Sequence, residues 1–209
     1  MTKTKIHSLL LVSILLSFTP YKLIAQAVHI SWHEKRWALF HPIAAIKVKR
    51  IAKQCAQITA CVETHHNLDH FKSGGKLDAY RHVFYMAAFA KKVNPKKIKK
   101  LGVAHEKTNF KQFKRSTFED GEVPDSVSCE MDLKNNAFGI ALGRISKSSN
   151  LQELSDLVLL EIEKGKAWIM KRNTAGNYLS CDEQTIDLTQ YKGVWAIPKC
   201  LVPSNYHDQ

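Results

Sequence analysis

Apolar residues recur at every third or fourth position along most of this chain, the spacing that is typical of amphipathic α-helices. The pattern predicts long helices over residues 77–93, 95–107, 126–146 and 151–164, and shorter helices between residues 31 and 60. Because segment 77–93 is apolar on nearly all sides, we expect it to be the buried central helix. The sequence therefore predicts a mainly α, single-domain helical bundle.

Capping and turn residues mark where these helices begin and end. Ser31 and Glu34 fit a capping box that opens the first helix, and Pro42 either kinks that helix or starts a second one. The charged segment 108–125 has the composition of a loop. After residue 166 the helical spacing is lost, which predicts a small β-hairpin or an irregular tail.

The amino terminus has the composition of an export signal. Two lysines precede an apolar run over residues 9–18, and Ala25-Gln26-Ala27 matches the small-x-small pattern of a signal-peptidase site. The run is about half the length that a membrane span needs, so we expect cleavage and no transmembrane anchor. We expect an exported bacterial protein, periplasmic or secreted. We divide the chain into a signal peptide (1–27), amino-terminal helices (28–66), a helical core (67–165) and a tail of the same domain (166–209).

Five cysteines in a chain that is predicted to be exported make a disulfide plausible. Cys181 and Cys200 flank a polar carboxy-terminal segment, and we favour their pairing. Cys55 and Cys61 would lie on different sides of one continuous helix and cannot bond there. Cys129 is either a reactive thiol or, the interpretation that we favour, a structural cysteine.

Three short polar clusters interrupt the apolar helices of the core. Ionisable side chains cost free energy when they are buried without a partner, so clusters at helical spacing suggest one shared site. Residues four apart lie on one face of a helix, as Asp78 and His82 do, and as Asp132 and Asn136 do. The clusters are Asp78-Ala-Tyr-Arg-His82, Ala104-His105-Glu106 and Glu130-Met-Asp132-Leu-Lys-Asn135-Asn136.

Two functional interpretations and one structural interpretation of this site stay open. A divalent metal such as zinc could be held by Asp78, His82, His105 and Asp132, with Glu106 as base. Without metal, His82 or His105 could act as general base oriented by Asp78 or Asp132, while Arg81 and the amides of Asn135 and Asn136 stabilise developing negative charge. The third interpretation is a buried network that only fixes the helices. The predicted catalytic residues are His82, His105, Glu106, Asp132 and Arg81, and the predicted substrate-binding residues are Asn135, Asn136, Lys100 and Lys107.

The three motifs, in this order over about residues 67–146, resemble a family of uncharacterised bacterial domains. Such domains occur in exported proteins and at the carboxy ends of toxin-like polypeptides. The resemblance implies a shared site and supplies no substrate. Lys134 stands where histidine is common in that family, and Tyr85-Met86 stands where an aromatic-Asn pair is common, so a ligand role is not expected at these places. We expect a free-standing exported protein, hydrolase-like or else a non-catalytic envelope binding or structural protein.

Charge indicates the class of partner. The formal net charge is +12, and residues 91–115 contain ten basic side chains and a single acid, Glu106. A positive surface of this kind attracts anions. For an exported protein we expect an anionic envelope component, either a lipid head group or peptidoglycan. Nucleic acid is less favoured, because the lysines are not interleaved with aromatic residues in a known binding motif.

Overall fold

The computed structural model describes residues 30–66, 68–69, 71–115 and 123–206. The predicted signal peptide lies outside these residues. In the described part the elements are α1 (Trp32–Phe40), α2 (Pro42–His65), α3 (Lys76–Ala90), α4 (Pro95–Lys114), α5 (Ser126–Ile145), α6 (Leu151–Glu163), β1 (Trp168–Met170), a 3-10 turn η1 (Leu188–Tyr191) and β2 (Leu201–Pro203). The mainly α fold class predicted from the sequence is confirmed.

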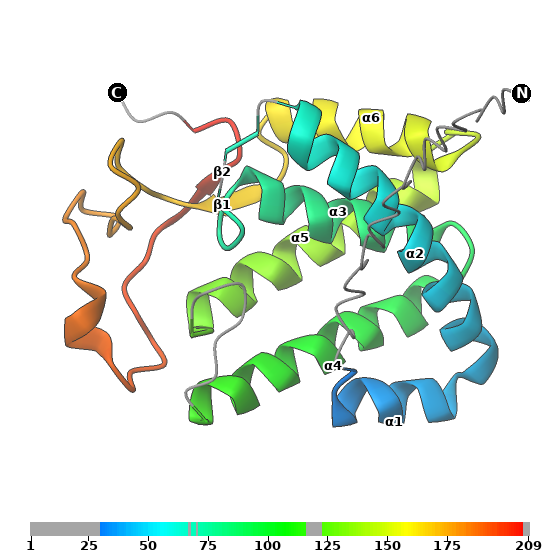
Figure 1. Cartoon of the computed structure of the whole chain (residues 1–209), viewed down its shortest axis with the longest axis horizontal. Helices are drawn as coiled ribbons and strands as arrows, with labels where there is room; N and C mark the ends of the chain where they lie inside the picture. Colours follow the sequence, from blue (N-terminus) through cyan, green and yellow to red (C-terminus); the bar gives the residue numbers. More distant parts are fainter. Residues whose placement is uncertain (1–29, 67, 70, 116–122, 207–209) are drawn as a thin grey trace, which may run out of the picture.

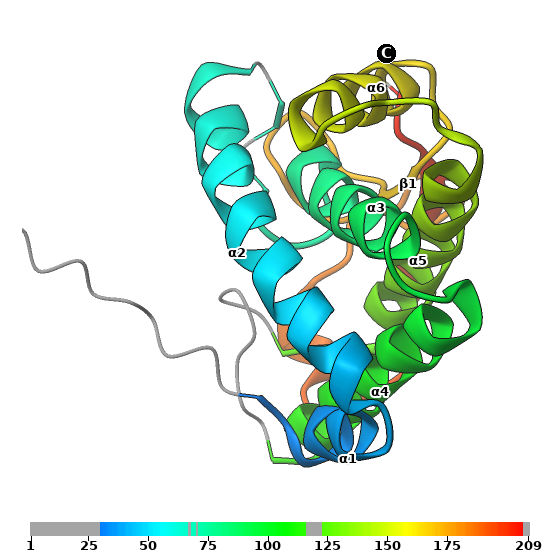
Figure 2. The same ribbon diagram turned by 90° about the vertical axis from the view of Figure 1, so that its right-hand side faces the viewer.

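Helix α3 forms the centre of the bundle, as its apolar sequence predicts. It packs against α2, α4, α5 and α6, and the two views show it enclosed by these neighbours (Figures 1 and 2). Tyr80, Val83 and Phe84 are fully buried on it. Helices α1 and α4 lie side by side at the opposite end of the bundle from α6 (Figure 1).

Two glycines allow α5 to lie directly against the backbone of α3. A Cβ atom added at Gly139 would lie 2.4 Å from the Val83 carbonyl oxygen, and one added at Gly143 would lie 2.2 Å from the Ala87 carbonyl oxygen. No side chain fits at such distances, so glycine is required at both positions. This contact brings the polar residues of the two helices close together.

Most predicted helix boundaries agree with the structure, but α4 is longer than predicted. The capping box of Ser31 and Glu34 is present, and Pro42 begins the separate helix α2. The loop predicted over 108–125 is wrong for its first seven residues, because α4 continues to Lys114. Phe110 and Phe113 hold this last part of α4 by ring contacts with Trp195 of the tail.

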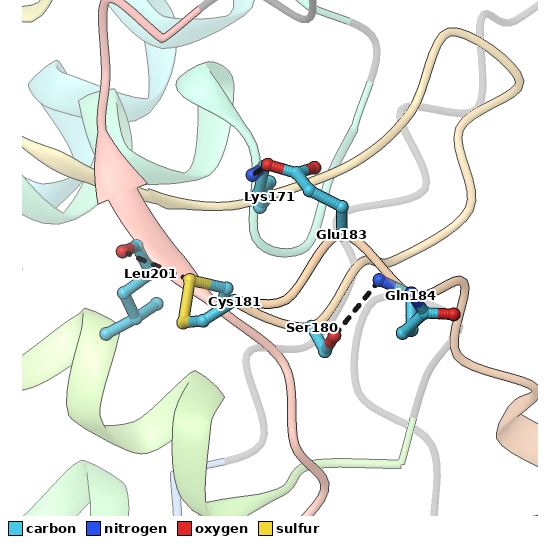
Figure 3. Close-up of a disulfide and its surroundings, with 7 residues drawn as sticks. Lys171, Ser180, Cys181, Glu183, Gln184 and Leu201 are labelled. Carbon is cyan, nitrogen blue, oxygen red and sulfur yellow. Dashed lines mark hydrogen bonds and ion pairs between the residues drawn. A yellow bond between two sulfur atoms is a disulfide. The ribbon is translucent and has the colours of Figure 1, made fainter.

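The tail forms a small sheet and one disulfide. Strands β1 and β2 pair antiparallel with Ile169 opposite Val202, but a long segment separates them, so they are not the two arms of one tight hairpin. The disulfide predicted between Cys181 and Cys200 is confirmed. It lies beside β2, near the ion pair of Lys171 with Glu183 (Figure 3). The bond fastens the long segment between the strands back to β2.

No helix in the described parts of the chain combines the length and the apolar character that crossing a bilayer requires.

Candidate functional site

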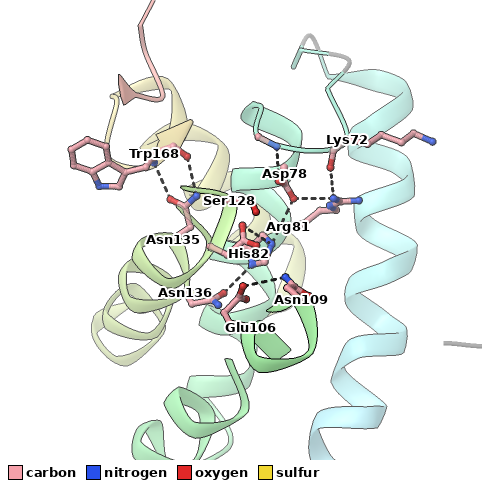
Figure 4. A network of polar contacts seen from close by, with 12 residues as sticks. Lys72, Asp78, Arg81, His82, Glu106, Asn109, Ser128, Asn135, Asn136 and Trp168 are labelled. Carbon is pink, nitrogen blue, oxygen red and sulfur yellow. Dashed lines mark hydrogen bonds and ion pairs between the residues drawn. The ribbon is translucent and has the colours of Figure 1, made fainter. Parts of the chain in front are cut away.

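The polar residues of α3 lie in its first two turns and are held by the loop before it. Asp78 is buried, and its Oδ2 accepts a hydrogen bond of 2.8 Å from the backbone N–H of Gly74. Its Oδ1 pairs with Arg81, one turn along, at 2.9 Å from Nη2. Arg81 also donates to the carbonyl oxygen of Lys72. The loop and the arginine together fix the position of the Asp78 carboxylate (Figure 4).

His82 links α3 to α5 and faces both carboxylates of the site. Its Nε2 lies 3.2 Å from Asp132 Oδ1 and 3.6 Å from Asp78 Oδ1. Its Nδ1 lies 3.1 Å from Asn136 Oδ1. The side chains of His82, Asp78 and Asp132 are 17%, 9% and 10% exposed, so the group is largely shielded from water but reachable at its edge. We call the site of Asp78, His82, Glu106, Asp132 and Asn136 the polar seam.

Glu106 enters the polar seam from α4. It is buried, and its Oε2 accepts a hydrogen bond of 3.1 Å from Asn109, one turn along the helix (Figure 4). Burial, and then the negative charge of Asp132, raise the pKa of Glu106 to about 7. A carboxyl group with such a pKa can exchange a proton near neutrality, as a general base or acid must.

The donor atoms of Asp78, His82 and Asp132 suit a divalent cation. One oxygen or nitrogen from each of the three side chains lies within 4.8 Å of the other two. Two carboxylates and one imidazole are ligands for zinc and for manganese. The contact of His82 Nδ1 with Asn136 Oδ1 fits this set, because a metal-binding histidine usually donates its other ring N–H to an acceptor.

His105, predicted as catalytic and as a metal ligand, lies away from this group. Its Nδ1 is 3.2 Å from Oε1 of Glu34 on α1, so it joins α4 to α1 rather than to α5. Burial alone would raise the pKa of Glu34, but hydrogen bonds from His105 and Ser31 outweigh burial and lower the pKa to about 2. The expectation that all four tentative ligands converge is therefore wrong for His105.

Asn135 and Asn136, both predicted to bind substrate, have different surroundings. Asn135 is fully buried and exchanges two hydrogen bonds of 2.9 Å with the backbone of Trp168, which occupies its amide group. Asn136 lies in the polar seam beside His82 and Gly102. Its buried Nδ2 has no hydrogen-bond partner among the described residues. Of the two amides, only that of Asn136 is placed to contact a ligand.

Lys100 and Lys107 lie on a different face of α4 from Glu106. Both line a groove between α1 and α4, whereas Glu106 and Asn109 face the polar seam. Neither lysine lies in the seam. The prediction that they bind substrate at the same site as Glu106 is therefore wrong.

Asn109 is a residue of the seam's surroundings that the sequence analysis did not identify. It orients Glu106, and its position three residues later on the same helix is the signal that could have identified it.

Cys129 lies beside Glu106. Burial, and then this neighbouring acid, raise the pKa of the Cys129 thiol, which argues against a reactive thiolate. The interpretation of Cys129 as structural is thus the better supported one.

The chain belongs to the family of a domain of unknown function, DUF6973, whose family model matches residues 35–166. The matched range contains every residue of the polar seam. It ends before β1 and the disulfide. No curated protein and no solved structure matches the chain significantly.

Proposed function

We propose that the polar seam is the catalytic centre of an exported hydrolase that uses a divalent metal held by Asp78, His82 and Asp132. The observation that carries the proposal is the convergence of three ligand atoms within 4.8 Å on adjoining helices. The resemblance of the sequence motifs to exported and toxin-associated bacterial domains supports a place outside the cytoplasm.

The hydrogen bonding of His82 supports a cation at this position. If the Nδ1–H donates to Asn136 Oδ1, the neutral ring presents a lone pair on Nε2. That lone pair would face the oxygens of Asp132 and Asp78, which repel it. Either a proton on Nε2 or a metal ion between the three groups removes the repulsion. A metal bound there would supply an activated water for attack on an ester, amide or phosphoryl centre.

The remaining residues of the site have roles that follow from where they lie. Glu106 is buried beside Asp132 and can accept a proton from the attacking water. Arg81 is 29% exposed at the rim, where its charge can stabilise a developing oxyanion. Asn136 can donate its buried Nδ2–H to the same ligand.

A version without metal uses the same contacts. In it the proton between His82 Nε2 and Asp132 makes the histidine a general acid or base that the carboxylate orients. The two versions differ in one measurable property, which is whether the wild-type protein binds a divalent cation.

Calorimetric titration of the metal-free protein with Zn²⁺ and with Mn²⁺ tests the metal version. We expect one strong site in the wild type, and binding that is weaker by about 100-fold or more in His82→Gln and Asp132→Asn. Glu130→Gln is the matched control, because Glu130 is an exposed carboxylate on the same helix that pairs with Lys134. Circular dichroism of each variant checks that the fold is kept. Absence of binding by the wild type would rule out the metal version.

Turnover of model carboxylic, phosphomonoester and phosphodiester substrates tests the hydrolase itself. Glu106→Gln should abolish turnover while keeping metal binding. An inactive wild type across the panel, with both His82→Gln and Asp132→Asn lowering the melting temperature sharply, would favour the second candidate, a non-catalytic envelope protein. The observation that favours this candidate is the burial of the other four seam residues around His82, which a purely structural network also explains: Asp78, Glu106, Asp132 and Asn136.

A further inference from the structure

Helices α1 and α4 enclose a groove on the side of α4 that faces away from the polar seam. Its volume is about 980 Å³. Trp37 is buried within the lining and joins the two helices, because its Nε1–H donates to the carbonyl oxygen of Lys97 at 2.9 Å. We call this feature the α1–α4 groove.

The described charged side chains that line the α1–α4 groove are positive. Among the residues that the structure describes, its lining contains one arginine and four lysines, with two histidines, and no acid: Arg36, Lys96, Lys99, Lys100, Lys107, His33 and His41. The four lysines recur along α4 at the spacing of one helix face. The nearest acid on α1, Glu34, is committed to Ser31 and His105. The groove is therefore complementary to an anion.

Large apolar side chains of α1 and of the start of α2 are exposed. Phe40 lines the groove and is 66% exposed. Trp32 and Leu39 on the same helix, and Ile43 and Ile46 in the first turns of α2, are exposed as well. Several large apolar side chains exposed within so short a stretch of chain favour a binding surface.

We propose that the α1–α4 groove and its apolar edge bind the surface of an anionic lipid membrane. Lysines and arginine would contact the phosphate groups, while Trp32, Leu39 and Phe40 would enter the boundary between head groups and acyl chains. Tryptophan beside aliphatic residues is the composition that favours this boundary.

Aliphatic residues distinguish a membrane from the other large anion, a nucleic acid. Single-stranded nucleic acid binds by stacking bases on aromatic rings. Leu39, Ile43 and Ile46 have no ring, yet each is at least 66% exposed, and they flank Phe40 of the groove in the sequence. Such side chains gain free energy in an acyl layer and gain nothing from a base.

This inference does not depend on the proposed hydrolase. The groove is lined by Lys99, Lys100 and their neighbours on one face of α4, while Glu106 and Asn109 occupy another. A variant such as Asp132→Asn, which removes a proposed metal ligand, should bind vesicles as the wild type does. Failure of one proposal would thus leave the other standing.

Sedimentation of the purified full chain with lipid vesicles tests the proposal. The vesicles contain phosphatidylcholine alone, or equal parts of phosphatidylcholine and phosphatidylglycerol. We expect the double variant Lys99→Gln/Lys100→Gln to bind the anionic vesicles on the order of 20-fold more weakly than the wild type at low salt. The matched control, Lys49→Gln/Lys53→Gln, loses the same charge from exposed positions of α2 outside the groove and should lose much less affinity.

A second pair of variants tests the apolar edge. Phe40→Ser should weaken binding to the anionic vesicles, whereas Leu160→Ser, an exposed leucine on α6, should not. Every variant carries the same amino-terminal segment, so the compared proteins differ only at the substituted positions. Equal losses from both lysine pairs would overturn the proposal, since they would show attraction by net charge alone. Binding of a single-stranded oligonucleotide that is lost with the groove lysines, without vesicle binding, would overturn it as well.

Discussion

Asn135 of α5 and Trp168 of β1 exchange two hydrogen bonds, in which the side-chain amide of Asn135 takes the place of a neighbouring strand. Nδ2 donates to the Trp168 carbonyl oxygen, and Oδ1 accepts from the Trp168 N–H, both at 2.9 Å (Figure 4). The pair attaches the small sheet to the helix that carries Asp132. It also explains why Asn135 is buried although its side chain is polar.

Replacing Asn135 should therefore destabilise the protein. We expect Asn135→Ala to lower the free energy of unfolding by about 2 kcal/mol, because two partly buried backbone groups lose their partners. Asn135→Asp should cost at least as much, since it places a carboxylate oxygen against the Trp168 carbonyl oxygen. Urea denaturation followed by circular dichroism measures both. Wild-type stability in Asn135→Asp would show that the donated hydrogen bond is dispensable.

Glu106 should make stability depend on pH. Its pKa is about 7 in the folded protein against an ordinary 4.5, so the native state favours the protonated acid. The contribution of protonated Glu106 to the free energy of unfolding is complete below pH 4.5, and it is lost as the pH rises through about 7. Glu106→Gln removes this loss, so well above pH 7 the variant should be more stable than the wild type, by up to about 3 kcal/mol.

Thermal unfolding of both proteins across this pH range, in the presence of a chelator, measures the effect. Below the ordinary pKa of glutamate the two melting temperatures should approach each other. The control Glu130→Gln alters an exposed carboxylate on α5 and should track the wild type throughout. A constant difference between Glu106→Gln and the wild type at every pH would contradict the raised pKa.

Gly143 should not tolerate a side chain. The Cβ of Gly143→Ala would lie 2.2 Å from the carbonyl oxygen of Ala87, so α5 must move away from α3. We expect a loss of about 3 kcal/mol in the free energy of unfolding, despite the higher helix propensity of alanine. Ala141→Gly, at an exposed position of the same helix, should cost only about 1 kcal/mol and calibrates the propensity term.

A weaker metal affinity is expected to accompany the loss of stability in Gly143→Ala, because the polar seam depends on the distance between α3 and α5. Calorimetry at a temperature where the variant is folded would show this. Unchanged affinity together with unchanged stability would mean that the two helices can separate without cost.

The disulfide should stabilise the tail and, through it, the bundle. Cys181 and Cys200 close a loop with a sequence separation of 19, for which the chain-entropy relation gives about 3 kcal/mol. Cys181→Ser/Cys200→Ser should lose stability of this order in chemical denaturation without reductant. Cys61→Ser removes an exposed free thiol and should leave the stability unchanged. Equal stability of the double variant and the wild type would show that the tail is held by its other contacts alone.

The sequence predicts the helices and most of the polar seam because both depend on local spacing. Asp78 and His82 lie one turn apart, as do Asp132 and Asn136, and any helix places such pairs on one face. Gly139 and Gly143 follow Asn136 by one and two turns of the same helix, and α3 approaches α5 closely at both glycines. These features follow from helix geometry and need no knowledge of the rest of the fold.

Local spacing does not tell which neighbour a helix face meets, and the errors have this origin. The sequence predicts that His105 joins the shared polar site, but its side chain meets Glu34 of α1 instead. Lys100 and Lys107 belong to the same helix as Glu106 and still line a separate groove. The end of α4 depends on Trp195, a distant residue of the tail, and no local pattern reports that contact.

Three contacts tie helix α5 to the part of the chain beyond residue 166, where the family match ends. Asp125, the residue that caps α5, forms a buried ion pair of 2.7 Å with Lys199. The N–H of Ser126 donates to the Trp195 carbonyl oxygen, and Asn135 holds Trp168. Trimming the protein to its family boundaries for crystallisation would leave the Asp125 carboxylate without its cation. Crystallographers should therefore retain the chain through Lys199 and its neighbour Cys200 at least, since a shorter piece would remove these contacts of α5 and leave Cys181 without its disulfide partner.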